Sequence, residues 1–268
     1  EVTKLYNEVQ CANTITTPES YFNTVLYTGN RPNTQSITGV GFKPDFVWAK
    51  LRSANGYGAV LANSVSGAQK FLDSSNDSSE VSAANSLTSF DTDGFSVGGY
   101  GNWNGGANAA NGTMVSWNWK AAASNATNNN GTIASTVRAS QESGFSVVKW
   151  TGSGTSGDTV GHGLAPAGTS MLVIMKDLSA ANDWMVITNN LWSSPNQQYL
   201  KLNTDAGVAT SGADIYNVNN TTFKNDYRNT SGNDYIAYCF ANVDGYQRIG
   251  SYVGNGSANG PYIYTGFE

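Results

Sequence analysis

The chain has 268 residues, 39% of them apolar and 12% aromatic, which is enough for one large or two modest domains with real cores. Its net charge is −5 and only 12% of its residues are charged, so it lacks the clustered basic surface that a non-specific nucleic-acid binder needs. No apolar run approaches the roughly 18 residues of a membrane-spanning helix, and we expect neither nucleic-acid binding nor membrane insertion. The polar surface must consist largely of Asn, Ser, Thr and Gly, which favour strands and turns, so the composition predicts an all-β fold.

Residues 1–20 precede the first clear strand pattern, and we interpret them as an N-terminal arm. The arm contains Cys11, and the other cysteine of the chain is Cys239. Two cysteines are too few for a disulfide scaffold. The sequence leaves open whether both thiols are unpaired or whether a bridge ties the arm to the body.

The most informative feature is internal self-similarity. Val25–Asn30 (VLYTGN) recurs as Val148–Ser153 (VKWTGS) and again as Gly250–Asn255 (GSYVGN). After each of the first two copies comes a Gly-containing turn and then an apolar run that ends in a lysine, Lys50 or Lys176. Further on, the segments Met114–Trp119 and Tyr235–Phe240 also match. The same features in the same order predict two tandem copies of one unit.

The copies read as short strands separated by tight turns. Val47, Ala49 and Leu51 alternate with Trp48 and Lys50, which is the period-two pattern of a half-buried strand. We therefore expect two tandem antiparallel β-sandwiches of the jelly-roll or concanavalin-like kind. The expected domains are the arm at 1–20, a first sandwich at 21–125 and a second at 126–268, with Ala121–Gly131 as the linker. Turn signals fall at Asp93-Gly94, Asn104-Gly105, Asn130-Gly131, Asp244-Gly245 and Asn255-Gly256.

A third copy begins within the second domain and is cut short. It runs through Tyr262–Phe267 and stops at Glu268, where the next apolar strand is expected. Two interpretations stay open. In the first, these last strands complete the sheet of the second domain, or the chain was cut there. In the second, the terminal strand pairs with a neighbouring molecule by β-augmentation.

The segments Ile37–Lys50, Ser89–Ser96, Tyr235–Phe240 and Tyr252–Phe267 carry a resemblance to a known family. They resemble a repeat domain of unassigned function that recurs in predicted tail-fibre-like and other surface proteins of marine bacteriophages. The likeness covers roughly residues 21 to 268 and leaves the arm outside. It implies a concanavalin-like β-sandwich and a virion or host-facing role, and it carries over no catalytic residue.

Two acidic residues in a predicted hairpin are candidate ligands for a structural calcium ion. Asp91 and Asp93 lie in the stretch Phe90–Phe95, where two aromatic residues flank a tight turn. Calcium takes six to eight oxygen ligands from carboxylates, amides and carbonyls. A plain hairpin turn explains the same residues, because Asp side chains stabilise turns by bonding their own backbone. We expect no other cofactor.

A Gly-rich loop holds the candidate residues for binding a glycan or a surface. Within Gly98–Gly106 the residues Tyr100, Asn102 and Trp103 combine flat rings with an amide, the groups that stack on sugars and satisfy their hydroxyls. Such loops are usually exposed, which would let Trp103, and less clearly Trp192, face solvent. The interpretation that we prefer for both rings is that each folds back as a lid on the core.

Catalytic chemistry finds little support in the sequence. The single histidine, His162, lies where the first copy has the turn Gly39–Gly41, and we interpret it as a turn residue. One histidine with two distant cysteines cannot supply the usual zinc or iron ligand set. Pairs of carboxylates such as Asp73 and Asp77 lie in polar stretches, whereas a catalytic acid needs burial to raise its pKa.

We therefore expect a non-enzymatic subunit of a phage particle, tail-fibre-like or a decoration protein, found on a virion or outside a cell. Its partners would be other copies of itself, other virion or surface proteins, and cell-surface glycans. A subunit of an extracellular filament or surface layer, assembled by strand or arm exchange, is the alternative. A secreted glycan-binding module is a further one.

Overall fold

The structure is a computed structural model that describes residues 15–106, 111–165, 170–190, 197–211, 216–226 and 229–266, without the side chains of Gln197, Tyr216 and Asn225. The expected all-β fold is confirmed, since the named elements of the described residues are strands apart from two short helical turns. Every pair of named strands is antiparallel. The helices of the described residues are two short 3₁₀ turns, η1 (Pro18–Ser20) and η2 (Gly101–Trp103). In these residues no helix has the length and apolarity needed to cross a membrane.

The first unit, residues 22–119, consists of a large and a small sheet. The large sheet has six strands in the order β1-β9-β3-β4-β5-β6, and the small sheet has the order β2-β8-β7. Between them lies a core that includes Val47, Phe95 and Trp103. The strands are β1 (Phe22–Thr28), β2 (Gln35–Thr38), β3 (Phe46–Leu51), β4 (Val60–Asn63), β5 (Lys70–Asp73), β6 (Val81–Ser82), β7 (Leu87–Asp91), β8 (Gly94–Val97) and β9 (Thr113–Trp119).

The second unit, residues 126–241, has the same two kinds of sheet around its own core. The large sheet has the order β10-β11-β12-β20-β14-β15-β16-β17, and the small sheet has the order β13-β19-β18. Trp150, Val173 and Phe223 lie in the core between them. The strands are β10 (Ala126–Asn128), β11 (Ser135–Ser140), β12 (Phe145–Thr151), β13 (Thr159–Gly161), β14 (Met171–Asp177), β15 (Met185–Thr188), β16 (Gln197–Lys201), β17 (Ala209–Ser211), β18 (Tyr216–Val218), β19 (Thr222–Asn225) and β20 (Asp234–Ala241).

Strand order and pairing register correspond between the two large sheets. Apart from β10 and β11, the order β12-β20-β14-β15-β16-β17 repeats the order β1-β9-β3-β4-β5-β6. In the first unit Lys50 and Leu26 lie opposite Val115 on either side of β9. In the second unit Lys176 and Lys149 lie opposite Ile236 on either side of β20. Lys50 and Lys176 therefore hold corresponding places in the two sheets.

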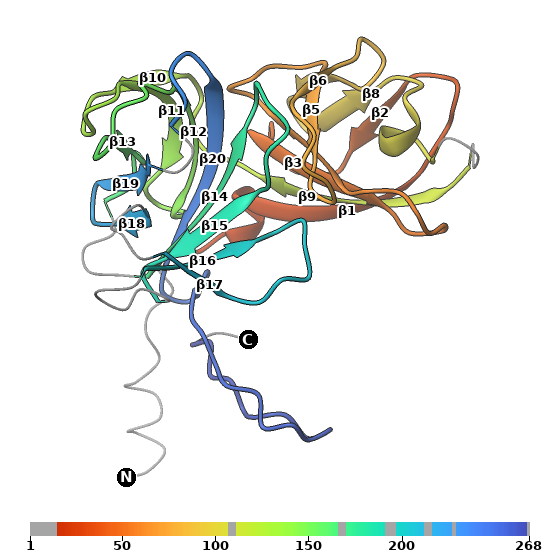
Figure 1. Cartoon of the computed structure of the whole chain (residues 1–268). Coiled ribbons are helices and arrows are strands. Elements are labelled where there is room, and N and C mark those ends of the chain that lie inside the picture. The colour runs from red at the N-terminus through yellow and green to blue at the C-terminus, as the bar shows by residue number, and fades with distance from the viewer. Residues whose placement is uncertain are drawn as a thin grey trace.

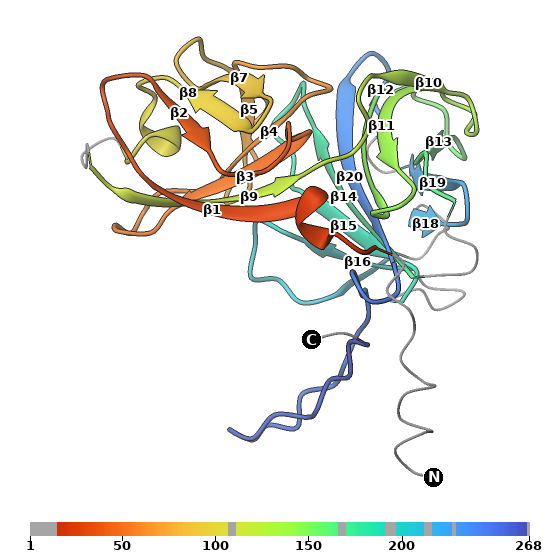
Figure 2. The same ribbon diagram turned by 180° about the vertical axis from the view of Figure 1, so that it is seen from behind.

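A third core joins the two units. Each large sheet has an outward face, which points away from its own small sheet, and the outward faces of the two large sheets pack against each other. The ring of Phe46 stacks on Tyr238 with ring centroids 4.0 Å apart, and Trp119 contacts Phe145 and Phe240. In Figures 1 and 2 the strands β1, β3 and β9 cross the direction of β20 and β14 at this contact. The two sandwiches thus share a buried face.

The stretch that we expected to be a linker is part of the folded body. Ala121 is buried in the shared core, and β10 begins at Ala126. The backbone N–H of Ala121 donates to Asp45, which also accepts from Arg138 of β11. These bonds fix the crossing between the units on both sides, so it cannot act as a free hinge.

The two ends of the described chain differ in burial. Ile15, within the expected arm, is buried, so this residue belongs to the body. Residues 250–266 form no strand, and all of them are exposed. In Figures 1 and 2 this segment, deep blue, projects away from both sandwiches. The third-copy pattern therefore lies outside the sheets described above.

Candidate functional site

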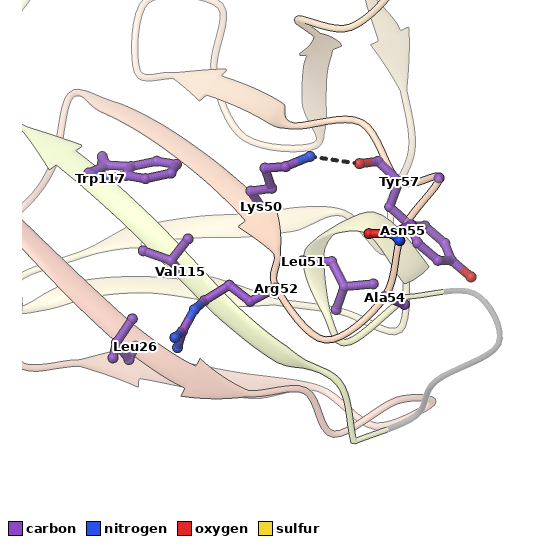
Figure 3. A pocket seen from close by; sticks show the side chains of 10 residues that line it. Leu26, Lys50, Leu51, Arg52, Ala54, Asn55, Tyr57, Val115 and Trp117 are labelled. Atoms are coloured by element: carbon purple, nitrogen blue, oxygen red, sulfur yellow. Dashed lines mark hydrogen bonds between the residues drawn. The ribbon is translucent and has the colours of Figure 1, made fainter. Parts of the chain in front are cut away.

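An open groove of about 560 Å³ lies on the outward face of the first large sheet, at the end that the second unit does not cover. Leu26, Val115 and Trp117 form its apolar floor, and Lys50 and Arg52 add two cations (Figure 3). Leu26 is 63% exposed and lies beside Trp117 in the groove lining. The full lining is Leu26, Lys50, Leu51, Arg52, Ala54, Asn55, Gly56, Tyr57, Val115 and Trp117.

The strand pattern places these side chains on one face. Side chains alternate between the faces of a strand, so Leu26, Val115 and Lys50, which lie side by side in the sheet, share the outward face. The ammonium group of Lys50 donates to the backbone oxygen of Tyr57 at 3.0 Å (Figure 3). This bond holds the loop between β3 and β4 against the end of β3 and forms one wall of the groove.

The chemistry of the lining suits binding. It offers an apolar floor, two aromatic rings and two cations, and none of the ten lining residues carries a carboxylate, an imidazole or a thiol. An apolar surface with a few placed polar groups is the usual composition of a binding site. The groove is therefore complementary to a partner segment that presents apolar side chains together with carbonyl oxygens or negative charge.

The Gly-rich loop places one aromatic ring in the core and leaves the other partly accessible. Trp103 is fully buried in the first core and contacts Phe71 edge-on, so its ring folds back onto the core, as we preferred, and is not available as a surface-binding residue. Tyr100 is 37% exposed and Asn102 is half-buried, so these two residues are accessible in part. Trp192 lies outside the described residues.

The physical reason for the burial of Trp103 is the neighbouring Asn104. Its side-chain amide donates to the backbone oxygens of Asn33 and Gly98, and its side-chain oxygen accepts from the backbone N–H of Asn30. The hydroxyl of Tyr27 donates to the backbone oxygen of Trp103. These bonds fold the loop onto the sandwich and direct the indole ring inward.

The expected hairpin forms between β7 and β8, where Asp91 pairs with Gly94, but the two carboxylates accept hydrogen bonds from residues outside the turn. Asp93 accepts hydrogen bonds from the backbone N–H groups of Gly39 and Gly41, and these two bonds hold the pKa of its carboxyl below the usual value. Asp91 accepts from the hydroxyl of Ser96. The described residues contain no group of three or more His, Cys, Asp or Glu side chains that could hold a metal ion. A structural calcium ion at Asp91 and Asp93 stays a prediction.

The histidine and the described cysteine are both inside the protein. His162 follows β13 in a turn, as expected, and its two ring nitrogens contact the backbone oxygen of Asn219 and the backbone N–H of Leu164. Burial lowers the pKa of this imidazole. Cys239 is a free, buried thiol whose pKa burial raises to about 12, and Cys11 lies outside the described residues.

The two acidic residues considered for paired catalysis take part in the contact between the units. The backbone oxygen of Asp73 accepts from the indole N–H of Trp184, and that of Asp77 accepts from the ammonium group of Lys176. The carboxylate of Asp73 accepts from Ser75 within its own loop. Both residues are thus placed to hold this loop against the second unit.

Sequence reasoning missed the groove, although one signal was present. In the matched segments Val25–Asn30 and Val148–Ser153, Leu26 stands where the second copy has Lys149. An apolar residue that replaces a charged one at an outward strand position marks a surface suited to contact with a partner.

The chain was also compared with known proteins. Comparisons with curated proteins and with solved structures gave no match. A family model described as a domain of unknown function (DUF7483) matches residues 17–268, and the chain therefore belongs to that family.

Proposed function

We propose that this chain is a non-enzymatic structural or host-facing subunit of a phage particle, such as a tail-fibre-like or decoration protein, which acts by assembly and surface binding. The observation that carries the proposal is exposed apolar surface in two separate places. Leu26 is exposed in the groove, and a second set projects on the terminal segment: Tyr252, Val253, Tyr262, Ile263 and Tyr264. Large exposed apolar patches on a folded protein mark interaction sites.

The shared strand order of the two large sheets supports this function. The two large sheets share their strand order, and Lys50 and Lys176 hold corresponding register positions. A duplicated sandwich whose copies are fused through a common core makes a stiff module. Stiffness suits a structural subunit, because a rigid surface loses little conformational freedom when it binds.

The hydrogen bonds of the histidine and of two aspartates that could act in catalysis support a non-enzymatic role. His162 is bonded to backbone groups on both ring nitrogens, and Asp93 is bonded to two backbone N–H groups. Asp177, which is buried, accepts from two backbone N–H groups and from the amides of Asn182 and Asn233. Each of these groups stabilises a turn and would have to leave it to take part in chemistry.

A subunit of an extracellular filament is the second candidate, and the projecting segment at residues 250–266 favours it. Val253 is 89% exposed there, and an exposed segment that joins no sheet of its own molecule can pair with the sheet edge of a neighbouring one. A location on a virion or outside a cell fits both candidates. A glycan-binding role would have to use the accessible Tyr100 and Asn102, since Trp103 is buried.

Sedimentation velocity of the purified chain over a concentration series tests the proposal. We expect the sedimentation coefficient to rise with concentration or to settle at that of a discrete oligomer. A single monomeric species at every concentration, together with no binding to particles or cell surfaces, would contradict it.

A further inference from the structure

The groove of the first unit has a counterpart in the second unit that is covered. The strand registers of the two large sheets show which residues correspond: Leu26 to Lys149, Val115 to Ile236, and Lys50 to Lys176. Lys176 is buried, whereas its counterpart Lys50 is exposed; Ile236 and its counterpart Val115 are both buried, and Leu26 is largely exposed. The place of this lysine is thus covered in the second unit and open in the first.

A segment of the first unit closes the counterpart. This segment, Asp73–Glu80, leads from β5 to β6. The ammonium group of Lys176 donates to the backbone oxygen of Asp77 at 3.1 Å, and the backbone N–H of Glu80 donates to the backbone oxygen of Leu178 at 3.0 Å. The loop therefore uses backbone groups for this contact: a carbonyl that accepts from Lys176 and an N–H that donates to Leu178.

The second unit has a turn in the corresponding place of its own large sheet. Among the described residues this turn makes no comparable contact with the first unit. Leu72 pairs with Leu61, and Leu200 pairs with Val186, so the turn Leu202–Val208 has the place that Ser74–Glu80 has in the first unit. Asp205 then stands where Asp77 stands, and Val208 where Glu80 stands. Residues 204–208 are all exposed, with Val208 at 47%.

We propose that the groove of the first unit binds the turn Leu202–Val208 of a second copy of this chain. This contact between two molecules would have the same form as the contact that Asp73–Glu80 makes with the second unit within one molecule. Lys50 takes the role of Lys176 and donates to the carbonyl of Asp205, while Val208 lies against the backbone of Arg52, as Glu80 lies against Leu178.

Charge and shape agree with this partner. The groove presents Lys50 and Arg52 on a chain whose net charge is −5, and the turn carries the carboxylate of Asp205. The exposed Leu26 on the floor of the groove would be covered by the turn, and so would Lys50, whose counterpart Lys176 is buried in the second unit. The base of the turn is already held in place, since Asn203 bonds Trp184 and Asp183.

The resulting interface joins the second unit of one copy to the first unit of the next. It uses two different surfaces, so it is heterologous and produces rings or open filaments. The inference rests on the proposed function, because it names the partner through which assembly would proceed.

Cross-linking between two variants, each with one introduced, accessible cysteine, tests the contact. One full-length chain carries Arg52→Cys, the other carries Val208→Cys with a size tag, and both carry Cys11→Ser so that the buried Cys239 is the remaining native thiol. After mixing and treatment with a short bis-maleimide, we expect a cross-linked heterodimer of one tagged and one untagged chain. The matched control replaces Val208→Cys by Ser82→Cys, an exposed position on β6, and should give far less product.

Leu26→Arg, added to the Arg52→Cys chain, supplies a second readout. Because it places a charge on the apolar floor, it should weaken the association about tenfold or more, with a matching loss of cross-linked product. Equal cross-linking in the test and control mixtures, while the wild-type chain still assembles, overturns the loop-in-groove contact and leaves the proposed function standing. Absence of both cross-linking and wild-type assembly overturns both.

Discussion

Arg138 of β11 and Asp45, which precedes β3, form an ion pair across the two units with 2.7 Å between Nη1 and Oδ1. The side chains of both residues are largely buried. The same carboxylate also accepts from the hydroxyl of Ser64 and the backbone N–H of Ala121. Asp45 is thus the point where the first sheet, the crossing segment and the second sheet are tied together.

Arg138→Met should destabilise the fold strongly. The substitution leaves Asp45 as a buried carboxylate without its counter-ion, which costs about 3–5 kcal/mol of unfolding free energy. Urea unfolding measures it. The matched control is Lys149→Met, which removes a more exposed pair with Asp234 and should cost about 0–1 kcal/mol. Equal losses in the two variants would show that the pair between the units has no special role.

Trp103→Ala should destabilise the first sandwich, because the indole ring fills its core. Loss of a buried tryptophan costs about 3–5 kcal/mol, and thermal unfolding followed by tryptophan fluorescence measures it. Tyr100→Ala in the same loop removes a ring that is 37% exposed and should cost much less. A Trp103→Ala protein that melts like the wild type would contradict the buried placement of the ring.

Stability should fall as the pH is lowered from 7 toward 5. The imidazole of His162 has a pKa near 6.5 in the unfolded chain and a lower one in the fold, where burial disfavours its charged form. The unfolded chain therefore binds more protons in the window below 6.5, so stability is full above that pH and decreases as the pH drops toward the pKa of the folded state.

The comparison of His162→Gln with the wild type isolates this effect. The pKa values of Asp93, Asp158 and Asp234 are lowered below 3.8, so their contribution is lost at more acidic pH. The variant should have a flatter dependence of melting temperature on pH between 7 and 5. Parallel profiles for the two proteins would rule out His162 as the source.

Removal of the segment after Ile249 should leave stability nearly unchanged and weaken assembly. Residues 250–266 are exposed throughout, so their loss should alter the unfolding free energy by no more than about 0.5 kcal/mol. Ile249 itself packs against the shared core and stays in the variant. Calorimetry and sedimentation velocity measure the two quantities. A large drop in melting temperature would mean that the segment belongs to the folded body.

Local patterns were sufficient to predict the strands and the hairpin. Alternation at Val47–Leu51 marked β3, and Asp93-Gly94 marked the turn between β7 and β8, because both signals depend on neighbouring residues. The burial of Trp103 could not be predicted in this way. It depends on bonds from Asn104 to residues about 70 positions earlier in the chain, such as Asn33.

The contact between the units was beyond sequence reasoning for a similar cause. Alternation separates the two faces of β3 but does not say that Phe46 and Trp48, on the outward face, meet a second sheet instead of water. The groove is the part of this face that stays open, so its extent depends on how far the second unit reaches. The sequence signal for the groove was the difference between Leu26 and Lys149 at matched positions of the two copies.

Electron microscopy of the purified full-length chain at increasing concentration tests most directly whether this protein acts by assembly. We expect ordered oligomers or filaments in which neighbouring subunits meet through the groove at Leu26 and Lys50. Dispersed single subunits at every concentration would contradict self-assembly as the basis of its function.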